Sequence, residues 1–225
     1  MTPPEATRPD SGGRVRLPRD ERRALLLDAA LDAFSQQGYH ATAMDDIAER
    51  AGVSKPVLYQ HFDSKLALYL AIAVRVRDEI VSTIENALAS TTDNSEKMAA
   101  TLAAFFEFID RPRSGYPLIL ASDMGGEPAV AQVLAETQLG CAEAVGRLLQ
   151  EQTDLGREEC VMLGMALVGQ VQAVAVHWLE SGSTMPRQHA VDLVVTLAWR
   201  GIAAMPRVGV GSAAEVVSRH GGQAG

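Results

Sequence analysis

Apolar residues recur along most of this chain at intervals of three and four positions, the spacing that places them on one face of an α-helix. The first such stripe predicts a helix over residues 19–37, with Gly38 positioned to end it. Its apolar members are Leu26, Leu27, Ala30, Leu31, Ala33 and Phe34. The strict alternation that marks a half-buried strand is not convincing anywhere in the sequence. The pattern therefore predicts an all-α protein.

Clusters of Ser, Thr, Asp, Gly and Pro divide the periodic stretches and set the expected helix ends. Thr42 is positioned to cap the second helix through its side chain. The full prediction is about nine helices, over 19–37, 43–50, 54–61, 63 or 64 to 89, 94–110, 116–123, 129–152, 158–180 and 186–205. Residues 1–16 are predicted to be a flexible basic arm, and residues 206–225 a flexible tail.

The amino-acid composition indicates a folded protein and excludes several classes. The chain has 225 residues, of which 47% are hydrophobic and 21% charged, so it can bury a core. Its net charge of −8 excludes a highly basic, histone-like coat for nucleic acid, although several arginines between residues 8 and 23 make a local basic segment. The two cysteines, Cys141 and Cys160, are too few for a disulfide scaffold or a cysteine-based zinc site.

Enzyme and membrane classes find little support in the sequence. There is no Ser-His-Asp ordering, no metal-spaced His/Asp set and no phosphate-binding loop, so no catalytic residue and no metal ligand is predicted. The apolar stretch 160–179 is interrupted by Gly and Gln, which favours a buried helix over a membrane span. The N-terminus lacks the apolar segment of a signal peptide. We therefore expect a cytoplasmic protein with no membrane partner.

A helix-turn-helix is predicted near the N-terminus. The short helices over 43–50 and 54–61 are joined by a three-residue turn that contains Gly52, which supplies the backbone freedom that such a turn needs. Leu58 and Phe62 are spaced to pack inward from the second helix. By spacing alone, an ordinary helical hairpin remains an alternative to a DNA-binding motif.

The outer face of the second helix favours DNA binding. Once Leu58 and Phe62 face inward, Lys55, Tyr59 and Gln60 remain outside. A Gln side chain can form a pair of hydrogen bonds with a base edge, and Lys and Tyr can hold phosphates. This mixture of residues, with few acidic groups, suits a DNA groove better than open solvent.

Residues 22–70, RRALLLDAALDAFSQQGYHATAMDDIAERAGVSKPVLYQHFDSKLALYL, resemble the N-terminal domain of the TetR family of bacterial transcription regulators. The resemblance implies a homodimer that reads a palindromic operator in double-stranded DNA. It also implies a helix-turn-helix domain over 17–69 and a larger effector-binding and dimerisation domain over 70–205. The DNA contacts carried over by position are Thr42, Ser54, Lys55, Val57, Tyr59, Gln60, His61 and Lys65.

A narrower resemblance covers both domains. The chain is similar to the subgroup of these regulators that activates fatty-acid synthase genes and is released from DNA by long-chain acyl-CoA. The matching segments include RLPRDERR at 16–23, STTDN at 90–94, AFFEFID at 104–110 followed by GYPLI, and the later HWLE and LAWRG pieces. The resemblance implies that the effector is a long-chain acyl-CoA and that the protein needs no cofactor.

The effector site is predicted from apolar residues of the C-terminal part, although each of them could equally be ordinary core. The candidates are Leu102, Phe105, Phe106, Ile109, Leu118, Leu139, Met165 and Trp178. Basic residues that could hold the CoA phosphates are Arg75, Arg77, Arg111, Arg113 and Arg147. The helices over 158–180 and 186–205 are expected to form the dimer interface, with intramolecular packing as the alternative.

Two other functions stay open at this level. The same fold could repress an efflux or catabolic operon while sensing a different hydrophobic small molecule. The helix-turn-helix could also contact only a protein partner. In each ligand-responsive case, the long helix from about 64 to 89 is expected to be the lever between the two domains.

Overall fold

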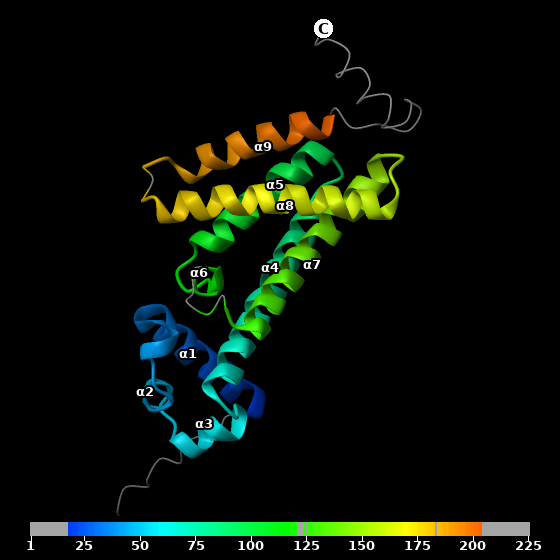
Figure 1. The fold of residues 1–225 in the computed structure, drawn as a ribbon. Coiled ribbons are helices and arrows are strands. Elements are labelled where there is room, and N and C mark those ends of the chain that lie inside the picture. The colour runs from blue at the N-terminus through cyan, green and yellow to red at the C-terminus, as the bar shows by residue number, and fades with distance from the viewer. Residues whose placement is uncertain (1–17, 121–123, 125, 183, 204–225) are drawn as a thin grey trace, which may run out of the picture.

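The structure, a computed structural model, describes residues 18–120, 124, 126–182 and 184–203. This part of the chain forms nine α-helices and contains no strand, which confirms the all-α prediction (Figure 1). The predicted arm at 1–16 and tail at 206–225 lie outside the described residues. The helices are α1 (Arg19–Ala41), α2 (Met44–Arg50), α3 (Lys55–His61), α4 (Lys65–Leu88), α5 (Asn94–Asp110), α6 (Tyr116–Leu120), α7 (Pro128–Gln152), α8 (Arg157–Glu180) and α9 (Arg187–Ala203).

Local sequence signals set several helix ends. Gly38 has φ 78° and kinks α1 before its last residues, as the predicted helix end there requires. Gly52 has φ 65° and lies in the turn between α2 and α3. Ser64 caps α4, because its side chain accepts a hydrogen bond from the backbone N–H of Ala67 at 3.0 Å. These features need no tertiary contacts, which explains why the sequence predicts them well.

The first three helices pack around a small core of their own. Leu26 and Phe34 of α1, Ile47 of α2 and Leu58 of α3 are each at most 1% exposed. Burying an aliphatic or aromatic side chain of this size contributes about 1.5–3 kcal/mol. The same core continues into α4, so the helix-turn-helix is fixed to the rest of the chain.

Helix α4 connects the two ends of the molecule (Figure 1). Its first turns bury Leu68 and Tyr69, and its later turns bury Ile80 and Ile84 against the larger helical bundle. Movement of either end of this continuous helix must displace the other end or bend the helix between them.

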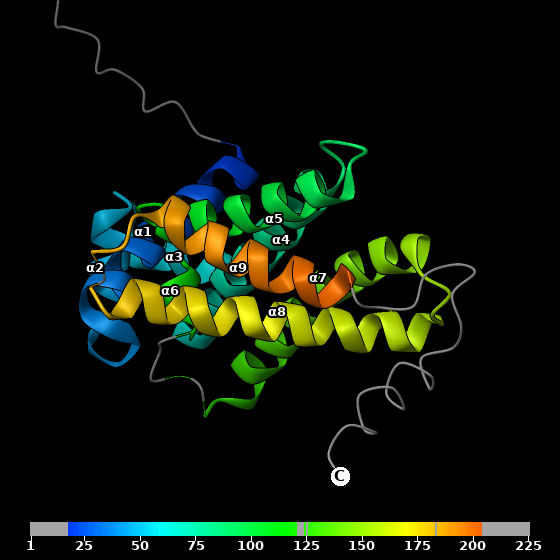
Figure 2. The same cartoon turned by 90° about the horizontal axis from the view of Figure 1, so that it is seen from above.

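The larger bundle is formed by α4, α5, α7, α8 and α9. Helices α8 and α9 lie side by side across the end of the molecule opposite α3, as both views show (Figures 1 and 2). Helix α7 approaches α8 closely at Gly164, where an added Cβ would collide with the backbone carbonyl of Ala142. This crossing therefore requires glycine.

The outer faces of α8 and α9 are apolar and uncovered in the single chain. Met162 of α8 is 65% exposed, and Leu193 and Leu197 of α9 are 51% and 58% exposed. The prediction that the stretch 160–179 is a buried helix is therefore wrong for the isolated chain. By length and composition α8 could also cross a membrane, a test that core helices of soluble proteins pass as well.

Candidate functional site

Helix α3 has one buried apolar side and one exposed polar side. Leu58 is fully buried and holds the helix against α1 and α2, as the sequence predicts. Ser54, Tyr59 and Gln60 are exposed, while Val57 is partly buried. The helix lies at one end of the molecule (Figure 1), so nothing in the described chain covers this face. It is available to enter a groove.

Lys55 is exposed beside an acidic neighbour. Its Nζ lies 2.8 Å from a carboxylate oxygen of Asp45 in α2. This hydrogen-bonded pair raises the pKa of Lys55. The ammonium group is therefore charged and is held beside the first turn of α2. A phosphate or base acceptor would compete with Asp45 for it.

The end of α3 lies beside the arginines of α1. Burial, followed by the nearby charges of Arg19, Arg22 and Arg23, lowers the pKa of His61. The Arg23 guanidinium also lies over the Phe62 ring, 4.8 Å from its centroid. The first turns of α1 thus extend the cationic part of the α3 surface.

Two of the predicted DNA contacts, Thr42 and Lys65, form hydrogen bonds within the protein. Thr42 is 1% exposed and donates its hydroxyl to the carbonyl of Gly38 at 2.7 Å, so it does not cap α2. The cap position of α2 is Ala43. Lys65 donates from Nζ to the carbonyls of Tyr39, His40 and Thr42 at 2.9–3.3 Å.

The position of Lys65 follows from the end of α1. The chain that leaves α1 after Gly38 exposes carbonyls that no helix satisfies, and the ammonium fills that position. Its Nζ also lies 4.4 Å from the centroid of the Tyr39 ring. All three N–H donors of Lys65 have carbonyl partners in the free protein, and the phosphate contact assigned to this residue stays a prediction.

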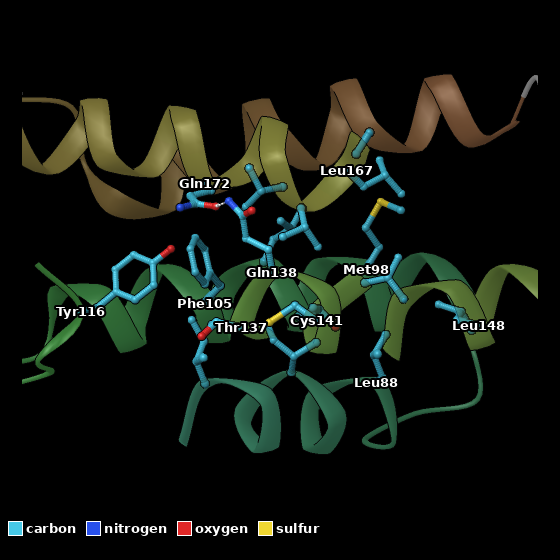
Figure 3. Close-up of a pocket in the computed structure, with 18 of the residues that line it drawn as sticks. Leu88, Met98, Phe105, Tyr116, Thr137, Gln138, Cys141, Leu148, Leu167 and Gln172 are labelled. Carbon is cyan, nitrogen blue, oxygen red and sulfur yellow. Dashed lines mark hydrogen bonds between the residues drawn. The ribbon is translucent and has the colours of Figure 1, made fainter. Parts of the chain in front are cut away.

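A second candidate site is a cavity of about 100 Å³ inside the larger bundle. It lies among α4, α5, α7 and α8, with Tyr116 of α6 at one end and Leu148 of α7 towards the other (Figure 3). The other lining residues are Ile80, Ile84, Leu88, Met98, Thr101, Leu102, Phe105, Leu134, Thr137, Gln138, Cys141, Val145, Leu167, Val168, Val171, Gln172 and Ala198.

The cavity wall is apolar with a few neutral polar groups. Gln138 donates from its amide nitrogen to the side-chain oxygen of Gln172 at 2.8 Å, across the space between α7 and α8 (Figure 3). Burial raises the pKa of Cys141 to about 11 and also raises the pKa of Tyr116. Both groups are therefore neutral near pH 7, and the cavity suits a mainly hydrophobic ligand.

Only two of the eight predicted ligand residues line this cavity, Leu102 and Phe105. Phe106 and Ile109 are buried in the core beside it, and Leu118 is partly buried outside it. Leu139 and Met165 are 45% and 39% exposed in the single chain and do not line this cavity, so their role in ligand binding stays a prediction.

Trp178 is also outside the cavity lining. Its ring lies 5.8 Å from that of Phe106, and its indole N–H donates to the carbonyl of Met185 at 3.0 Å. It therefore closes the turn between α8 and α9. Each apolar residue in these helices has the right periodicity, but the period does not say which neighbour it faces.

The five arginines considered for the CoA phosphates are all paired with carboxylates. Within 4 Å, Arg75 meets Asp28, Arg77 meets Glu136, Arg111 meets Glu107, Arg113 meets Asp32 and Arg147 meets Glu85. They do not form a ready cluster of unpaired cations. No group of three His, Cys, Asp or Glu side chains suited to a metal occurs among the described residues.

The segment between α5 and α6 connects the cavity to the helix-turn-helix. Tyr116 lines the cavity, and its neighbour Gly115 lies so close to α4 that an added Cβ would be 2.6 Å from Val76. Arg113 has a left-handed φ of 66° and reaches Asp32 of α1 at 2.9 Å. Only two residues therefore separate Tyr116 from Arg113 and its contact with α1, and the adjacent Gly115 packs against α4.

Comparisons with known proteins match this two-part arrangement. Residues 26–72 match the family of bacterial regulatory proteins, tetR family, and residues 94–201 match the tetracyclin repressor-like C-terminal domain. The HTH-type transcriptional activator FasR of Mycolicibacterium smegmatis is 44% identical over 201 residues, which cover 88% of this chain and 92% of that protein. The HTH-type transcriptional repressor KstR2 of Rhodococcus jostii is 34% identical over about half of each chain.

Solved structures share the fold. A TetR-like transcriptional regulator from Rhodococcus sp. RHA1 has a TM-score of 0.63 at 31% identity, covering 84% of this chain and all of that one. The transcriptional regulator FadR from Bacillus subtilis, solved in complex with stearoyl-CoA, has a TM-score of 0.63 at 16% identity, covering 78% of this chain and 96% of that one. The chain therefore belongs to the TetR family of bacterial regulatory proteins, which are helix-turn-helix DNA-binding regulators of transcription.

Proposed function

We propose that this protein regulates genes of fatty-acid biosynthesis and is released from its operator by long-chain acyl-CoA. The observation that carries this proposal is that an exposed polar helix, α3, and a partly enclosed apolar cavity are joined by a single helix, α4. Identity of 44% with the activator FasR over both domains supports the regulatory role. The stearoyl-CoA complex of the FadR structure supports the ligand class through the shared fold.

DNA reading is assigned to α3. Gln60 and Val57 would face base edges, while Ser54, Lys55, Tyr59 and His61 would hold the adjacent backbone. One helix of seven residues reads too few bases for a specific site. Two copies about 34–36 Å apart would read an inverted repeat in successive major grooves.

The second copy would dock on α8 and α9. The exposed side chains of Met162, Leu193 and Leu197 give these helices an apolar surface that water solvates poorly. Covering it with the same surface of a partner forms a symmetric interface. This interface lies at the end opposite α3 in Figure 1, so it leaves both recognition helices free.

The dimer can be tested on that surface. Leu197→Glu places a charge in the centre of the interface and should raise the dimer dissociation constant by at least about 100-fold. Gln152→Glu, at an exposed position near the end of α7, is the matched control. Sedimentation velocity measures both. Unchanged dimerisation of the Leu197 variant would move the interface elsewhere.

Release by ligand would follow from the size of the cavity. Its volume of about 100 Å³ is well below the roughly 300–1,000 Å³ of sites that hold drug-sized ligands. A long acyl chain can therefore enter only if the surrounding helices separate. Since α4 forms one wall and also carries the helix-turn-helix, expansion would change the spacing of the two α3 helices. Such couplings are typically about 1–3 kcal/mol.

The proposed roles divide the chain into two domains. Residues 17–69 are assigned to DNA binding, and residues 70–205 to effector binding and dimerisation. A cytoplasmic location accords with the role of a DNA-binding regulator.

The experiment is selection of duplexes from a random library, followed by release. The selected sequence should be an inverted repeat, and palmitoyl-CoA should dissociate it in a gel-shift titration while acetyl-CoA should not. If palmitoyl-CoA leaves binding unchanged, a thermal-shift screen of other lipophiles distinguishes a repressor that senses a drug or catabolite. If no DNA binding is found at low salt, the regulatory role itself is refuted.

A further inference from the structure

The polar groups of the cavity carry no formal charge. Among its described lining residues there is no Lys, Arg, His, Asp or Glu. A carboxylate or phosphate buried there would have no counter-charge, which is strongly unfavourable in an apolar interior. A carbonyl oxygen, in contrast, needs only a hydrogen-bond donor.

One donor in this wall has no partner. Thr101 of α5 is 8% exposed, and its hydroxyl oxygen is buried without a hydrogen bond. Within the described chain the only other buried side-chain atom of this kind is Nε of Arg75, whose other nitrogen is paired with Asp28. A hydroxyl buried without a partner costs about 1–3 kcal/mol.

Thr101 differs from the other helical threonines of the described chain. A threonine in a helix normally satisfies its hydroxyl on the carbonyl four residues earlier. Thr83, Thr137 and Thr196 each do so, at 2.7–2.8 Å. Thr137 lines the same cavity, so the location alone does not prevent this bond. The hydroxyl of Thr101 thus does not form the usual hydrogen bond with the carbonyl four residues earlier.

The neighbours of Thr101 show which ligand would use this hydroxyl. It lies one helical turn from Phe105 and one turn from Met98, on the face of α5 that borders the cavity. Apolar side chains therefore flank it on both sides along the helix. A ligand that satisfies it must be largely hydrocarbon with one neutral acceptor.

We infer that Thr101 is a specificity residue that donates a hydrogen bond to the uncharged carbonyl oxygen of an acyl ester or thioester. The inference rests on the proposed function, since it concerns the same cavity. The charged part of an acyl-CoA lies outside the cavity, and only the acyl chain and its carbonyl lie within it. A free fatty acid in its carboxylate form is disfavoured.

The test compares ligands that differ by one carbonyl. Palmitoyl-CoA carries the thioester, and S-hexadecyl-CoA has the same chain length without the carbonyl oxygen. With the full-length protein, calorimetry should give wild type about fivefold tighter binding to palmitoyl-CoA. Thr101→Val, which removes the hydroxyl and keeps the shape, should abolish that preference and leave S-hexadecyl-CoA binding unchanged.

Thr137→Val is the matched control. It removes a hydroxyl from the same cavity wall, but one already bonded to the carbonyl of Val133, so the preference for the thioester should persist. Thr101→Ser should retain the preference. A wild-type protein that binds the two ligands equally, or a Thr101→Val variant that loses both equally, overturns the inference.

Charge is tested by competition. Methyl palmitate should displace palmitoyl-CoA more effectively than palmitate does, and equal displacement would contradict the exclusion of a carboxylate. Failure of the proposed function gives a different result, in which wild type binds neither CoA ligand. Binding of both with no effect on DNA would refute the regulatory role while leaving the carbonyl contact intact.

Discussion

The α3 surface and the internal cavity are built in opposite ways. The α3 surface comes from seven consecutive residues, whose buried anchor and exposed polar groups alternate within two turns. The cavity is lined by side chains from α4 through α9, which are separated by more than a hundred positions in the chain. The cavity wall is apolar and partly enclosed, whereas the α3 face is polar and exposed to solvent.

This difference predicts different responses to mutation. A change on the exposed face of α3 alters contacts with DNA and leaves packing intact, because those side chains touch little else. A change in the cavity wall alters how helices pack, so ligand binding and stability change together. Only a substitution that preserves shape, such as Thr101→Val, separates the two in the cavity.

The largest effect is expected where the helices that form the cavity cross most closely. Gly164→Ala would force α7 and α8 apart, because its Cβ meets the Ala142 backbone. It should lower the free energy of unfolding by about 3 kcal/mol. Urea denaturation followed by circular dichroism, at one protein concentration, measures this.

Gly169 supplies the control on the same helix. In the single chain a Cβ added there has no neighbour within 4 Å, so at concentrations where both variants are monomeric Gly169→Ala should be neutral or stabilise by up to about 1 kcal/mol. Equal losses for the two glycine variants would show that the close crossing does not limit stability.

On the α3 face, Gln60→Ala should cost about 1–3 kcal/mol of DNA affinity and relax the preference at one base position in each half-site. Its melting temperature should stay at the wild-type value. Tyr59→Ala should weaken binding to all duplexes alike, because a phosphate contact carries no sequence information. Fluorescence anisotropy on selected and scrambled duplexes distinguishes the two. A uniform loss for Gln60→Ala would remove it from the base-reading set.

Lys65 begins α4, next to the helix-turn-helix, and could act in packing or in DNA binding. Lys65→Met keeps the aliphatic stem but leaves three carbonyls without their donor. Stability should fall by about 2 kcal/mol. At a temperature where the variant is folded, the salt dependence of DNA binding should match wild type. A shallower salt dependence for the variant would show that Lys65 contacts a DNA phosphate.

The smallest effect is expected at the connection between the regions. Arg113→Gln removes the exposed ion pair with Asp32, and such pairs contribute at most about 1 kcal/mol. Operator affinity without ligand should change little, but more palmitoyl-CoA should be needed for release. Arg157→Gln removes an ion pair with Glu143 that lies away from α1 and is the control. Identical release curves for both variants would exclude Arg113 from the coupling.

The sequence predicted the helices and the α3 face because both depend on near neighbours. Helix ends follow from Gly38, Gly52 and Ser64, and the face of α3 follows from the inward side chain of Leu58. The predicted cap of α2 by Thr42 is wrong, because the Thr42 hydroxyl bonds to the carbonyl of Gly38. The DNA contacts of Thr42 and Lys65 stay predictions beside these intramolecular partners. The sequence pattern does not predict which backbone carbonyls near the kink in α1 lack a helical partner.

The cavity was predicted less well for a physical reason. Periodicity distinguishes inward from outward positions, but it does not distinguish a tightly packed interior from an empty space. Phe106 and Ile109 point inward and fill the core, while Leu102 and Phe105 point inward and border the cavity. Leu139 and Met165 are apolar yet exposed. Thr101 gives no signal in the sequence, because its importance lies in a hydrogen bond that is not made.

The most direct test of the account is an anisotropy titration of the selected inverted-repeat duplex bound by the full-length protein. Palmitoyl-CoA should lower operator affinity by roughly 5–150-fold, the range of typical allosteric couplings, and acetyl-CoA should leave it unchanged. Palmitoyl-CoA that binds the protein by calorimetry but leaves operator affinity unchanged would contradict this prediction.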